Sequence, residues 1–136
     1  MSFDGAETIV SSLEIAAANA GDLTPAVYQR LFTDFPDTEA LFVLDRDGQV
    51  RGSMLTHVFE TIFDFIGERR YAHRFIASEI VTHEGYNVPP DAFAAFFGFV
   101  RDEIRIACGP AWTSEMDTAW ERLLIELRGY IVHASG

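Results

Sequence analysis

The chain contains no lysine and only one cysteine, and both scarcities limit the chemistry open to it. All ten basic residues are arginine, so a Schiff base of the pyridoxal kind would have no amine other than the N-terminus. Cys108 stands alone, which excludes a disulfide, a thiolate zinc site or a four-thiolate iron–sulfur cluster within one chain. This cysteine usage predicts a reducing, cytoplasmic location.

Basic residues and long apolar runs are also scarce. Acidic residues outnumber basic ones by 21 to 10, which gives a formal net charge of −11. Such a charge repels phosphate backbones and the anionic cytoplasmic face of a membrane, so we expect neither nucleic acid nor membrane as a partner. No apolar run reaches the roughly 18 residues that span a bilayer, and the N-terminus MSFDGAETIV has no basic region. We therefore expect no targeting segment and no membrane anchor.

Apolar residues, in contrast, are plentiful. They make up 49% of the chain, and twelve of them are phenylalanine, which is enough for a sizeable core and excludes disorder. A length of 136 residues fits one compact domain. We therefore predict a single domain over residues 1–136.

The spacing of the apolar residues predicts an all-α fold. They recur at three and four positions, the spacing of one helix face, and hardly anywhere at two. Thr24 is expected to cap the second helix, and Gly67 to end the helix that contains MLTHVFETIFDFI. The predicted helices cover residues 5–20, 24–35, 37–42, 54–66, 72–83 and 89–108, and a last one that Thr113 or Ser114 caps. Seven or eight helices, one of them very short and the last two long, are typical of a fold in which helices cross at about 50° around a buried pocket.

Four segments resemble those of one protein family. The run LTPAVYQRLFTDFPDTEALF is similar to the second and third helices of bacterial single-domain globins and of the haem domain of flavohaemoglobins, in which a tyrosine and a phenylalanine recur, here Tyr28 and Phe42. The segment HEGYNVPPDAF resembles the proximal-histidine segment of that family, with His83 in the histidine position. HVFETIFDF resembles its distal helix, and DTAWERL, with Trp120, its last helix. The resemblance covers residues 5–131 and implies a globin fold that holds haem b, iron protoporphyrin IX.

The resemblance also implies a role for each of these residues. His83 would bond the haem iron, although an isolated histidine at a helix end is more often a surface residue. Tyr28 would direct its hydroxyl toward a gas ligand; the alternative is an ordinary half-buried core tyrosine. Phe42 would pack on the macrocycle. The apolar surface of the proximal side would come from Val88, Phe93 and Phe97.

For the helix over residues 54–66, which would lie on the other face of the haem, the sequence leaves alternatives open. Met54 and Val58 lie one helical turn apart and would restrict access to the iron. At the position of Met54, the family often has glutamine or histidine. Met54 is therefore either an apolar gate or a sixth iron ligand, or else the alignment with the family is shifted and Arg51 or Leu55 occupies this position. For the haem propionates, His57 ranks first. The other candidates are Arg51, Arg70 and Arg74.

Three functions remain open at this stage. The first is reversible binding of oxygen or another diatomic gas. The second is oxidation of nitric oxide, as in flavohaemoglobins; it would need a separate reductase, and Phe93 and Ser135 stand where those proteins carry a tyrosine and a glutamate that make the proximal histidine more electron-donating. The third is a sensor or regulatory module. A homodimer through the last two helices is also compatible with the sequence.

Overall fold

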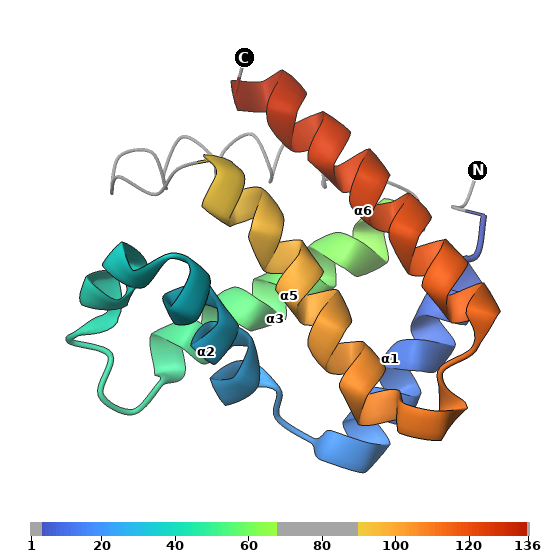
Figure 1. The fold of residues 1–136 in the computed structure, drawn as a ribbon, viewed down its shortest axis with the longest axis horizontal. Coiled ribbons are helices and arrows are strands. Elements are labelled where there is room, and N and C mark those ends of the chain that lie inside the picture. The colour runs from blue at the N-terminus through green and yellow to red at the C-terminus, as the bar shows by residue number, and fades with distance from the viewer. Residues whose placement is uncertain (1–3, 68–89, 136) are drawn as a thin grey trace.

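The structure is a computed structural model that describes residues 4–67 and 90–135 (Figure 1). These residues form five α-helices and two 3-10 helices, and no strand occurs among them, which confirms the predicted all-α class. The helices are α1 (Ala6–Ala20), α2 (Thr24–Asp34), η1 (Pro36–Phe42), α3 (Gln49–Ile66), α5 (Pro90–Cys108), η2 (Gly109–Ala111) and α6 (Ser114–Ser135). The helix predicted over residues 72–83 lies outside the described residues.

The helix ends follow from local side-chain chemistry. Helix α1 ends at Gly21, whose φ of 69° suits glycine. Thr24 does not cap α2 as predicted, because α2 already begins at Thr24. Instead, the carboxylate of Asp22 accepts hydrogen bonds from the Thr24 amide (3.0 Å) and hydroxyl (2.6 Å). Thr113 does cap α6, because its Oγ1 accepts a hydrogen bond from the amide of Met116 at 3.1 Å.

Helix α3 begins five residues earlier than the sequence pattern predicts. Gly48 precedes it with a φ of 75°, and Gln49 is its first residue. The carboxylate of Asp45 accepts hydrogen bonds from the amides of Val50 and Arg51, each at 3.0 Å. These two amides belong to the first turn, which has no intrahelical acceptors for them. The polar first turn of α3 therefore looks like a loop in the sequence but is held as a helix by one carboxylate.

Helix α5 is central to the packing, because it lies against α1, α2 and α6 (Figure 1). The largest fully buried side chains of the described residues include Trp120, Tyr28 and Phe65. Trp120 donates its indole N–H to the hydroxyl of Ser12 at 2.8 Å, and thereby joins α6 to α1 inside the core. Cys108 is also buried, and its thiol lies 3.4 Å from the Ser12 carbonyl, so it serves as a small core residue.

Helix α2 is also tied to α5 by charge. The guanidinium of Arg30 pairs with the carboxylates of Glu103 and Asp102, both on α5. Tyr28 lies on α2 two residues before Arg30, so this ion pair fixes the helix that carries the buried tyrosine.

Isoleucines are exposed on both long C-terminal helices: Ile106 of α5 is 59% exposed and Ile125 of α6 is 68% exposed. A homodimer through these helices stays a prediction. Within residues 4–67 and 90–135, no helix combines the length and the apolar character that crossing a membrane requires.

Candidate functional site

The fold brings Tyr28 and Phe42 into contact, two residues that the family resemblance assigns to the haem pocket. Their ring centroids are 5.3 Å apart in an edge-to-face arrangement. Phe96 of α5 also packs edge-to-face on the Tyr28 ring, with centroids 5.2 Å apart, and the ring of Phe32, one turn after Tyr28, has its centroid 5.9 Å from that of Tyr28. We call Tyr28, Phe32, Phe42 and Phe96 the aromatic cluster. It joins α2, η1 and α5 at one place in the molecule.

The hydroxyl of Tyr28 is buried and has no hydrogen-bond partner in the described structure. The residue as a whole is 1% exposed, so water at the protein surface cannot make the missing hydrogen bond. A buried polar group left unpaired costs about 1–3 kcal/mol, so the position is unfavourable unless something else accepts the hydrogen bond. Burial is the main reason that the pKa of Tyr28 is raised; the charge of Arg51 lowers it and that of Asp45 raises it by smaller amounts. The hydroxyl therefore keeps its proton at neutral pH and is available as a donor.

Arg51 and Asp45, whose charges both influence this hydroxyl, form an ion pair with each other. The Nε of Arg51 donates to Asp45 Oδ2 at 3.0 Å, and its Nη2 donates to the Asp45 carbonyl at 2.8 Å. Partial burial alone would raise the pKa of Asp45, but the amide hydrogen bonds from Val50 and Arg51, together with the Arg51 guanidinium, lower it overall. The carboxylate is therefore ionised at neutral pH and holds the guanidinium in place.

Helix α3 carries the other candidates for the ligand side. Met54 and Val58 are half-buried, and Val58 packs against the core. Leu55, which lies between them, is 3% exposed and belongs to the core. His57 is exposed, in agreement with a place at the rim of a pocket. The assignments of Met54 and Val58 to the ligand side, and of His57 to a propionate, stay predictions.

Most of the predicted proximal side lies outside the described residues. This holds for His83 and Val88, and for the propionate candidates Arg70 and Arg74. Phe93 lies in α5, but its side chain is not among those described. Phe97 is buried within the core cluster, with 3% of it exposed. Among the residues that are described, no group of three or more His, Cys, Asp or Glu side chains could hold a metal ion.

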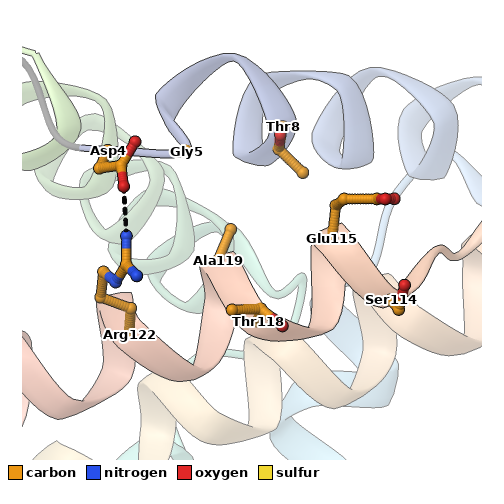
Figure 2. Close-up of a pocket in the computed structure, with 8 residues that line it drawn as sticks. All are labelled: Asp4, Gly5, Thr8, Ser114, Glu115, Thr118, Ala119 and Arg122. Carbon is orange, nitrogen blue, oxygen red and sulfur yellow. Dashed lines mark hydrogen bonds and ion pairs between the residues drawn. The ribbon is translucent and has the colours of Figure 1, made fainter.

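A separate depression of about 320 Å³ lies between the first turn of α1, with the two residues before it, and residues 114–122 of α6. At one end of it, the guanidinium of Arg122 of α6 pairs with the carboxylate of Asp4 (Figure 2), with an N–O distance of 2.7 Å. Thr8 and Glu115 line the same depression, which is open to solvent. None of its lining residues belongs to the aromatic cluster or to the sites predicted from the sequence.

Two features of the site were missed in the sequence. Phe32 and Phe96 lie in the helices predicted over residues 24–35 and 89–108 but are not among the predicted site residues, although the spacing of four between Tyr28 and Phe32 places both rings on one face. Asp45 was assigned to a loop. Its position before Gly48, with the helix starting directly afterwards, is typical of a residue that accepts hydrogen bonds from the first turn.

Comparison with known proteins places the chain in a family. The sequence model of the globin family matches residues 25–131, a range that includes Tyr28, Phe42, His83 and Trp120. No curated protein and no solved structure matches the chain. The family match extends over most of the sequence and agrees with the all-α arrangement of the described helices. The chain therefore belongs to the globin family.

Proposed function

We propose that this globin reversibly binds a diatomic gas, such as oxygen, nitric oxide or carbon monoxide, at a haem b whose iron is bonded by His83. Membership of the globin family implies haem binding. The observation that carries the proposal further is the unpaired, buried hydroxyl of Tyr28 inside the aromatic cluster. A bound ligand that accepts a hydrogen bond from the Tyr28 hydroxyl would explain why this donor is buried without a partner in the protein.

The described residues on this side fit a haem. The rings of Phe32, Phe42 and Phe96 provide apolar surface, which is what retains a large flat macrocycle, and the half-buried Met54 and Val58 would add to it from α3. When bound, haem supplies the iron coordination position at which a diatomic gas is held.

Tyr28 would donate its hydroxyl hydrogen to the bound gas. Because the group is enclosed by apolar rings, the hydrogen bond forms in a medium of low dielectric constant, where it is stronger than in water. The raised pKa of Tyr28 keeps the proton on the oxygen, so the residue acts as a donor throughout the neutral range. Its role is to slow the release of the gas.

On the other side of the macrocycle, His83 would be the protein ligand, with Val88 and Phe93 excluding water beside it. Phe93 bears on the choice between binding and oxidation, because a phenylalanine has no hydroxyl with which to make His83 more electron-donating. Ser135 likewise replaces a carboxylate. These two residues favour reversible binding over nitric oxide oxidation, and any oxidation would require electrons from a separate reductase.

The test is the absorption spectrum of the protein with haemin, in ferric and ferrous form and with carbon monoxide. We expect the wild-type protein to show a Soret band that shifts when carbon monoxide is added to the ferrous form. The variant His83→Ala should lose this band. The matched control is His133→Ala, which removes a histidine near the end of α6 that belongs to no predicted site and should keep the band.

Two results would contradict the proposal. A Soret band of the same position and intensity in His83→Ala would show that another residue is the iron ligand. A folded, colourless wild-type protein that takes up no haemin would instead favour a sensor or regulatory module that works without haem.

A further inference from the structure

We propose that Arg30 is a positioning residue for Tyr28: its ion pairs with α5 fix how α2 lies on that helix, and so fix the direction in which the Tyr28 hydroxyl meets the bound gas. This inference rests on the proposed function, because it concerns the donor of the hydrogen bond to the gas. It assigns to Arg30 no contact of its own with the haem or with the gas.

Helix α2 meets α5 at two places that lie close together along α2. In the first, the ring of Tyr28 packs edge-to-face on Phe96 of α5, with centroids 5.2 Å apart. In the second, Arg30 donates a hydrogen bond from Nε to the carboxylate of Glu103, and its Nη1 lies 3.8 Å from Asp102 Oδ2. Phe96 and Glu103 are seven residues apart, which is two helical turns, so they lie on the same face of α5. The ion pair therefore acts on the same helix–helix contact that holds the tyrosine ring.

The position of the Tyr28 hydroxyl depends on α2 itself. Within the described residues, this buried hydroxyl has no hydrogen-bond partner that could hold it. Its place is therefore set by the backbone of α2 and by the packing of the ring against Phe32, Phe42 and Phe96. The oxygen lies at the far end of a long side chain, so a small rotation of α2 about its axis displaces it more than it displaces the backbone.

A rotation of this kind would matter because hydrogen bonds are directional. The bond from a donor to the gas weakens steeply when its angle falls below about 120°. Ring contacts tolerate small shifts, since aromatic pairs are favourable over a range of centroid distances and tilts. A hydrogen bond between a planar guanidinium and a carboxylate has a more definite direction. Ring packing therefore fixes the approximate place of Tyr28, and the ion pairs of Arg30 restrict the rotation of α2.

The carboxylates that hold Arg30 are partly enclosed and belong to a network. The side chain of Glu103 is 13% exposed and that of Asp102 is 25% exposed. Asp102 also accepts a hydrogen bond from Nε of Arg101 at 2.7 Å, and Arg101 pairs with Glu121 of α6 at 3.1 Å. Single exposed ion pairs contribute little to stability, but charges that form a network contribute more. The α5 side of the Arg30 contact is therefore itself held in place.

The experiment measures oxygen release from the haem-loaded ferrous protein by stopped flow, and the C–O stretching frequency of its carbon monoxide form by infrared spectroscopy. The second readout responds to hydrogen bonds to the bound gas and not to the general stability of the fold. Arg30→Met is made in the wild type and in Tyr28→Phe. The matched control is Arg122→Met, which removes the same charge from an ion pair that lies apart from the aromatic cluster. Hydrogen exchange of the α2 amides in the haem-free proteins gives a readout that needs no haem.

Losing the whole hydrogen bond would speed oxygen release about 2- to 12-fold, so we expect Arg30→Met, which only misdirects the donor, to speed it about 2- to 5-fold. Its C–O stretching frequency should move toward that of Tyr28→Phe. In the Tyr28→Phe background, Arg30→Met should change neither readout, because no hydroxyl is left to position. Arg30→Lys, which keeps the charge but not the planar fork, should give intermediate values. Exchange of the α2 amides should be faster in Arg30→Met than in Arg122→Met.

Other outcomes would overturn this inference and leave the proposed function standing. They are wild-type oxygen release and C–O stretching frequency in Arg30→Met, equal effects of Arg30→Met with and without the Tyr28 hydroxyl, or equal effects of Arg30→Met and Arg122→Met. If Arg30→Met does not fold, Arg30→Lys takes its place in the same comparisons. A wild-type protein that takes up no haemin would overturn the inference and the proposed function together.

Discussion

The unpaired hydroxyl of Tyr28 leads to an unusual prediction: its removal should stabilise the protein without haem and weaken the complex with haem and gas. The perturbation is Tyr28→Phe, which deletes one oxygen atom and leaves the ring in place. The ring contacts with Phe42 at 5.3 Å and Phe96 at 5.2 Å do not involve the hydroxyl and should be retained.

The magnitudes follow from the burial of this group. The buried hydroxyl has lost its contact with water and has no partner within the described protein, at a cost of about 1–3 kcal/mol. We therefore expect Tyr28→Phe to raise the free energy of unfolding by about 1 kcal/mol, which corresponds to an increase in Tm of about 4 °C for a chain of this size. In the haem-loaded protein, the lost hydrogen bond is worth about 0.5–1.5 kcal/mol, so the gas should dissociate about 2- to 12-fold faster.

The assays are urea unfolding of the haem-free protein and stopped-flow measurement of gas release from the loaded protein. Tyr28→Leu is the control, because it removes the ring contacts as well as the hydroxyl and should destabilise the haem-free protein by about 2–4 kcal/mol. A haem-free Tyr28→Phe variant that is less stable than the wild type by about 1 kcal/mol would refute the reasoning, since the hydroxyl would then have a partner within the protein. An unchanged rate of gas release would refute its role as a donor to the ligand.

Two further predictions concern hydrogen bonds that hold the helices. Ser12→Ala leaves the indole N–H of the fully buried Trp120 without its acceptor, so the free energy of unfolding should fall by about 1–3 kcal/mol; in a urea-unfolding double-mutant cycle with Trp120→Phe, additive effects would contradict this coupling. Asp45→Asn should be less stable than the wild type at neutral pH. Because the pKa of Asp45 is lower in the folded protein than its ordinary value of 3.8, the stabilisation by the carboxylate is complete above that pH and disappears as the pH falls through the lowered pKa. Urea unfolding of both proteins from pH 7 to pH 2 tests this, and a stability difference that does not depend on pH would rule it out.

The α-helices and most of their ends are properties of the local sequence. Apolar residues at spacings of three and four predict α1, α2, α3, α5 and α6, because a helix with one apolar face must bury that face. Gly21, Gly67 and Thr113 end or begin helices where expected, since glycine conformations and side-chain caps depend only on neighbouring residues. The start of α3 was misplaced because its first turn is polar and is held by Asp45, a residue outside the helix.

The order of Tyr28, Phe42, His83 and Trp120 was also sufficient to indicate the globin family, because family resemblance depends on residue types in sequence and not on their contacts. The sequence could not show which of these residues would have a buried polar group without a hydrogen-bond partner. Whether Tyr28 is paired depends on every atom within hydrogen-bonding distance of its hydroxyl, and those atoms come from several helices.

What the sequence by itself determined, then, is the helical class, most helix ends and the residues that carry the family resemblance. Only the tertiary structure decided that Phe32, Phe42 and Phe96 pack against Tyr28, and that Asp45 holds Arg51 at the start of α3. The physical reason is one of distance. Periodicity and capping act over a few residues along the chain, whereas burial, charge and hydrogen-bond pairing depend on which helices meet in space.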